Sequence, residues 1–70
     1  MAERKSEIKP NIIIVPPDPL NPNTIGLRVE GHLATVYYDR DFIKSQKAHH
    51  RRELAYYEEL MSICDERGIK

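Results

Sequence analysis

The chain has 70 residues and a formal net charge of zero, with 11 lysines and arginines balanced by 11 aspartates and glutamates. This length allows one domain with a small core, and the neutral balance excludes a general attraction to nucleic acid. The single cysteine, Cys64, excludes an intrachain disulfide, so we expect a reducing, cytoplasmic location.

Residues 1–10 are predicted to be a flexible, charged N-terminal lead. The first seven residues are charged and no apolar stretch follows them, so a signal peptide is not predicted. The β-branched run at about 11–15 predicts a strand. It is apolar on both faces, so we expect it to lie centrally in a sheet or to be covered on its second side. The run is too short to cross a membrane, and no membrane partner is predicted. It is also a candidate for strand addition to a partner, through Ile12, Ile13, Ile14 and Val15.

Residues 16–23 hold four prolines and are predicted to form a surface loop, because proline lacks the N–H group of helix and sheet ladders. A β-hairpin is predicted at about 25–38, with a two-residue turn at Glu30-Gly31. In this register Val29 faces His32 across the hairpin. One face is then formed by Ile25, Leu27, Val29, His32, Ala34, Val36 and Tyr38.

High helix propensity predicts one long C-terminal helix over about 41–67, with Asp39 or Asp41 as N-cap and Gly68 as the stop. The fold class is therefore α+β. We expect a small sheet, made of the strand at 11–15 and the hairpin, packed on this helix in a single domain over 11–70.

The predicted helix has an apolar stripe that consists of Phe42, Ile43, Leu54, Tyr57, Leu60, Met61 and Cys64. Gln46, His50 and Glu53 interrupt its middle. Either the helix breaks near Ser45, or this polar layer stays in contact with water. A continuous helix would be about 39 Å long against about 20 Å for the strands, so the sheet cannot cover all of it.

Charge runs along the helix in the unexpected direction. A basic stripe precedes acidic residues, although a helix favours the opposite order. The stripe consists of Arg40, Lys44, Lys47 and Arg51, with Arg52 nearby. Three interpretations remain open: an acidic partner, antiparallel pairing of two such helices in a homodimer, or a solvated surface.

No combination of residues predicts catalysis, a cofactor or a metal site. The acidic neighbours of Cys64 would oppose a reactive thiolate. The adjacent His49 and His50 point about 100° apart on a helix and cannot share one ion. We therefore expect a protein that is not an enzyme.

The function predicted from these features is that of a small regulatory protein. It would bind a larger protein such as a polymerase or nuclease and inhibit or modulate it, in the manner of phage-type accessory proteins and some regulators of transcription. The expected contacts are the hairpin and the basic half of the helix. The candidate residues are Arg40, Lys44, Lys47, Arg51, Arg52, Tyr37, Tyr56 and Tyr57. The alternative is a nucleic-acid-binding protein that uses the basic helix face.

Overall fold

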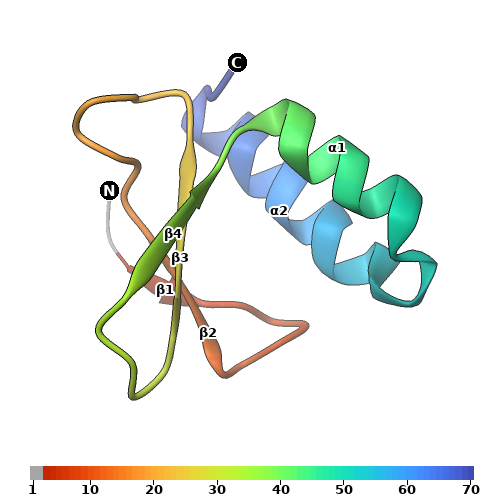
Figure 1. Cartoon of the computed structure of the whole chain (residues 1–70), viewed down its shortest axis with the longest axis horizontal. Helices are drawn as coiled ribbons and strands as arrows, with labels where there is room; N and C mark the ends of the chain where they lie inside the picture. Colours follow the sequence, from red (N-terminus) through yellow and green to blue (C-terminus); the bar gives the residue numbers. More distant parts are fainter. Residues whose placement is uncertain (1–2) are drawn as a thin grey trace.

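A computed structural model describes residues 3–70 of the chain. In this range one antiparallel sheet, ordered β1-β2-β3-β4, is followed by a helical hairpin (Figure 1). The predicted α+β class is confirmed. The elements are β1 (Arg4–Lys5), β2 (Ile12–Val15), β3 (Ile25–Val29), β4 (Thr35–Tyr38), α1 (Arg40–His49), the short 3₁₀ helix η1 (Arg51–Glu53) and α2 (Leu54–Arg67).

The core lies between one face of the sheet and the helix pair, which stands on one side of the sheet (Figure 1). Alternate residues of the strands point to this face, so the sheet contributes apolar side chains at every second position. The fully buried members of the core include Ile14, Ile25, Ile43, Leu60 and Cys64. At the end of α2, Arg67 also donates to the carbonyl of Val15 at 2.8 Å, which attaches this helix to the sheet.

β2 is a central strand, with β1 on one side and β3 on the other. This corrects the prediction of a flexible lead over residues 1–10 for the part that is described, since Arg4–Lys5 pairs with Ile13–Ile14. The physical reason lies in the residues that follow β1. Ser6 is buried and its hydroxyl donates to the Glu59 carboxylate of α2, which holds the lead against the helix.

The hairpin turn lies where the sequence predicts it, but its strand register is shifted by two residues. His32 N–H donates to the Val29 carbonyl at 2.9 Å across Glu30-Gly31, and Gly31 has a φ of 86°. The pairing that follows is nevertheless Leu27 with Val36, not Leu27 with Ala34. A shift of two residues keeps every side chain on its predicted face.

The shift places Tyr37 opposite Gly26. A Cβ atom on Gly26 would lie 3.1 Å from Cε1 of Tyr37, so the ring packs over the bare glycine backbone. The predicted register would instead have placed Thr35 opposite this glycine. An aromatic side chain fills the gap above a strand glycine better than a threonine does, which accounts for the observed pairing.

The predicted long helix is two helices, and the break lies at His50 instead of near Ser45. His50 has φ −120° and ψ 70°, outside the helical region, and its N–H closes α1 on the Gln46 carbonyl. The largest extent of the chain is 29 Å, so a straight helix of about 39 Å would project beyond the sheet. Folding back lets Ile43 of α1 join the core that α2 forms with the sheet.

Both helix ends agree with the sequence. Asp39 is the N-cap of α1 and accepts from Phe42 N–H at 2.7 Å, and α2 ends at Gly68. Within residues 3–70, no helix has the length and apolar character needed to cross a bilayer.

Candidate functional site

Two of the tyrosines predicted to contact a partner belong to the core. Tyr56 and Tyr57 are each 6% exposed, and their rings lie 5.3 Å apart. Burial raises the pKa of both phenol groups. Their prediction as partner contacts is therefore corrected, because both side chains are buried in the core of the chain. Tyr37, on the outer face of the sheet, remains 42% exposed.

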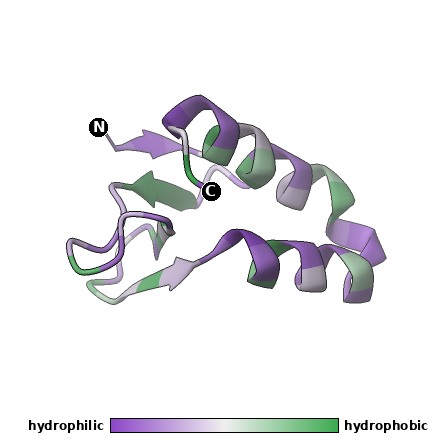
Figure 2. Cartoon of the chain, turned by 90° about the horizontal axis from the view of Figure 1, so that it is seen from above, coloured by the Kyte–Doolittle hydropathy of each residue, from purple (hydrophilic) through white to green (hydrophobic). Residues whose placement is uncertain are grey.

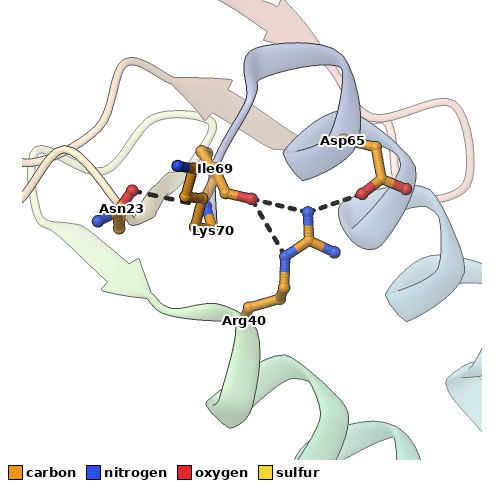
Figure 3. Close-up of polar contacts among 5 residues, drawn as sticks. All are labelled: Asn23, Arg40, Asp65, Ile69 and Lys70. Carbon is orange, nitrogen blue, oxygen red and sulfur yellow. Dashed lines mark hydrogen bonds and ion pairs between the residues drawn. The ribbon is translucent and has the colours of Figure 1, made fainter.

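Arg40 is also engaged within the chain (Figure 3). Its Nε and Nη2 atoms donate to the Ile69 carbonyl at 3.1 and 2.7 Å, and Nη2 contacts the Asp65 carboxylate at 2.7 Å. Nearby, Lys70 N–H points to the Asn23 side chain at 3.5 Å. The guanidinium thus links the start of α1 to the end of α2, and the role of Arg40 in binding a partner stays a prediction.

The same antiparallel arrangement pairs Lys47 of α1 with Glu58 of α2 at 3.5 Å. The basic stripe therefore lies beside the acidic residues of its own chain. This is the antiparallel helix pairing that the sequence suggested for a homodimer, made within one molecule. α1 also has a favourable local order of charge, since Asp41 lies in its first turn and Lys47 and His49 lie in its last turn.

Part of the basic stripe remains unpaired at the turn between the helices. Lys44, Arg51 and Arg52 form no ion pair with any residue from 3 to 70. With Lys47 they form a group that we call the basic cluster. A surface hollow beside it is lined by Lys44, Lys47, Ala48, Arg51 and Leu54, and an adjoining one by residues 48–53 with both histidines.

The second exposed feature is the outer edge of β4. Within residues 3–70, no strand pairs with β4 on the side away from β3. Large apolar side chains surround this edge: Leu33 is 99% exposed, Val36 50% and Tyr37 42%. The run 33–38 contains no charged residue, proline or glycine. Such an edge is prone to pair with another polypeptide.

The opposite edge of the sheet is different. β1 is two residues long and consists of Arg4 and Lys5. In Figure 2 this hydrophilic strand lies next to the N-terminus, beside the hydrophobic β2. Short length and positive charge both discourage the addition of a further strand. The contrast singles out β4 as the unprotected edge.

The strand-addition candidate Ile12–Val15 is corrected, because β1 and β3 occupy its two sides. Sequence reasoning had recognised Tyr37 but not Leu33, Thr35 or Val36 as residues of an open edge. The available signal was the absence of charge over 33–38, which is unusual for an exposed strand. The hairpin alone did not show which of its strands would be covered.

An apolar hollow adjoins the same edge on the inner face of the sheet. It is lined by Ile12, Leu27, Arg28, Val29, Val36, Tyr38 and Tyr56. The Tyr38 ring also lies 4.5 Å from the ring of Phe42, which is 42% exposed. Apolar surface therefore continues from the edge of β4 onto the first turn of α1.

Residues 3–70 hold no group of three or more His, Cys, Asp or Glu side chains placed to bind a metal ion. Cys64 is fully buried, and burial raises the pKa of its thiol, which disfavours the reactive thiolate. His50 lies beside Tyr57, with 6.4 Å between the ring centroids. The candidate surfaces are therefore the charged one at the turn between the helices and the uncharged one at the edge of β4.

The chain matches no protein-family model, and comparison with curated proteins and with solved structures likewise found no match. The two candidate surfaces are accordingly assigned from their own geometry and charge.

Proposed function

We propose that this chain is a small, non-enzymatic regulatory protein of the cytoplasm that binds a larger protein and modulates it. A polymerase or a nuclease is an example of such a partner. The contacts are the β3–β4 hairpin and the basic cluster. The observation that supports this proposal best is the unprotected edge of β4, with Leu33 and Tyr37 exposed beside it.

This edge favours a protein over other partners for a physical reason. The free N–H and C=O groups of a strand are matched by the backbone of another strand, and neighbouring apolar side chains add specificity. Tyrosine is also among the residues enriched at the energetic centre of protein interfaces. The basic cluster, with Arg51 and Arg52 unpaired in residues 3–70, complements an acidic surface on the same partner.

The proposal is tested by affinity capture from extracts of the source cells, with identification of the captured proteins by mass spectrometry. Two variants accompany the wild-type chain: Leu33→Asp at the hairpin and Arg51→Glu with Arg52→Glu at the basic cluster. Ser62→Ala, at an exposed position on α2, is the control. A specific partner should be retained by the control and reduced by both variants. A captured set that is identical for all four proteins contradicts the proposal.

A second candidate function, nucleic-acid binding, is supported by the basic cluster and the adjoining His49 and His50. A basic helix face can contact successive phosphates. The measurement is a salt titration of binding to duplex and single-stranded probes. A binder that uses this cluster loses affinity steeply with salt, and each removed phosphate contact lowers the slope by about 0.9. The zero net charge of the chain weighs against this candidate.

A further inference from the structure

The hairpin turn fixes the direction of the backbone groups in β4. His32 N–H donates to the Val29 carbonyl, so the polar groups of Val29 face β4. Backbone groups alternate from side to side along a strand, so those of Leu27 also face β4 and those of its partner Val36 face back toward β3.

The next residue confirms this alternation. Glu30 N–H points the opposite way, toward β2, and donates to the Asn11 carbonyl at 2.8 Å. It follows that Thr35 and Tyr37, the alternate residues of β4, direct their N–H and C=O groups outward. These are the groups that an added strand would meet.

We infer that the segment 33–37, which is the first three residues of β4 and the two residues before it, pairs with the same segment of a second copy, antiparallel, about a two-fold axis at Thr35. The inference goes beyond the proposed function, because a second copy and a strand of the larger partner would occupy the same edge of β4 and exclude each other there. In an antiparallel ladder, residues that exchange both hydrogen bonds stand opposite each other. The outward-facing residues of one copy therefore stand opposite outward-facing residues of the other. Because such residues alternate along the strand, the two-fold axis must pass through a residue and not between two neighbouring residues.

An axis at Thr35 brings the exposed apolar side chains together. Leu33 and Tyr37 lie at equal distances on either side of Thr35 in the sequence. Leu33 and Ala34 precede β4, and when they extend its strand in the dimer each Leu33 stands opposite Tyr37 of the other copy. Ala34 meets Val36 in the same way, and the two threonines meet on the axis. Aromatic–aliphatic and Thr–Thr pairs both stabilise antiparallel strands. No charged residue lies in the paired segment 33–37.

This self-complementarity is what selects a second copy over an unrelated strand. The segment supplies both the apolar groups to be covered and, in the reverse direction, the groups that cover them. The axis stands perpendicular to the joined sheet, so both helical hairpins lie on the same face. The two basic clusters are then presented on the same side of the joined sheet and are not part of the pairing.

The test is sedimentation velocity and light scattering over a dilution series, with thermal melts to show that each variant is folded. The wild-type chain should dimerise. Leu33→Lys and Tyr37→Glu should each weaken the dimer by at least about 10-fold in Kd. The double variant should regain affinity, because the introduced lysine of each copy then stands opposite the introduced glutamate of the other. Thr35→Lys, which places like charges on the axis, should be monomeric.

A covalent test checks the register independently of stability. Thr35→Cys should form an interchain disulfide under mild oxidation, since residues opposite each other in hydrogen-bonded pairs have suitable Cα separation. Ser45→Cys, on the exposed side of α1, is the control and should not crosslink at the same rate. The native Cys64 is buried and does not compete.

A wild-type chain that stays monomeric up to millimolar concentration overturns the inference, and so does a dimer that is insensitive to both single variants. These outcomes are separate from the proposed function. A monomer that still captures a larger partner through the hairpin leaves the proposed function in place. A dimer that follows the expected pattern but captures no partner supports self-pairing and contradicts the proposed function.

Discussion

The guanidinium of Arg40, at the start of α1, contacts the carboxylate of Asp65, near the end of α2, at 2.7 Å. With the Lys47–Glu58 pair at 3.5 Å, this contact explains why basic residues precede acidic ones along the C-terminal sequence. In a single straight helix that order opposes the dipole. In an antiparallel hairpin it places opposite charges side by side.

Replacing Arg40 should be more harmful than replacing Asp65. Arg40→Met removes both donors from the carbonyl of Ile69, a residue only 3% exposed, and should lower the free energy of unfolding by about 1–3 kcal/mol. Asp65→Asn should cost less than about 1 kcal/mol, because the aspartate side chain is 71% exposed. Urea unfolding monitored by circular dichroism measures both. Equal losses would show that the ion pair, and not the carbonyl contact, determines the effect.

Gly26→Ala should destabilise the sheet. The new Cβ would lie 2.5 Å from Cγ2 of Val15 and 2.7 Å from the Pro16 carbonyl oxygen. The backbone oxygen cannot move aside as a side chain can, so we expect a loss of about 1–3 kcal/mol from overpacking. Gly31→Asn is the matched control, because that position is open and Asn tolerates a positive φ. In thermal unfolding, the melting temperature of Gly26→Ala should be well below that of Gly31→Asn.

The stability of the chain should depend on pH through Glu53. The hydrogen bond from Lys9 is the largest cause that lowers the pKa of this carboxyl below its ordinary 4.5, opposed by partial burial. A lowered folded pKa means that ionised Glu53 stabilises the fold above pH 4.5 and that this contribution is lost as pH falls through the folded value.

The difference in unfolding free energy between the wild-type chain and Glu53→Gln should therefore shrink as the pH is lowered below 4.5. Denaturant unfolding at a series of pH values measures this difference. In a Lys9→Met background the glutamine substitution should have a smaller effect, because the principal partner is gone. A difference that stays constant across the acidic range would contradict the role of the ionised carboxylate.

Reversing charge in the basic cluster should leave the fold intact. Arg51→Glu and Arg52→Glu change exposed residues without an ion pair in residues 3–70, so each should alter the unfolding free energy by less than about 0.5 kcal/mol. Retention on a heparin column, a polyanionic probe, should nevertheless fall. Arg40→Glu makes the same charge change but should destabilise the protein markedly. If all three variants unfold alike, the distinction between structural and exposed arginines is wrong.

Sequence patterns determined the features that depend on near neighbours. The apolar alternation of the hairpin indicated its inner face, and Asp39 and Gly68 marked the helix ends where α1 begins and α2 stops. Each of these features is decided by a few consecutive residues, through backbone conformation or a local hydrogen bond. These features therefore do not depend on how distant segments of the chain pack.

The tertiary structure alone decided where the helix folds back, how the hairpin strands are registered and which side chains remain exposed. The break at His50 has no proline or glycine to mark it, and follows from packing Ile43 against the shared core. The register depends on Tyr37 reaching Gly26 across the sheet. Arg40 and Tyr56 look like surface groups in the sequence, but contacts from distant residues bury or bind them. Such contacts form only when segments far apart in the chain meet, so a local pattern cannot specify them.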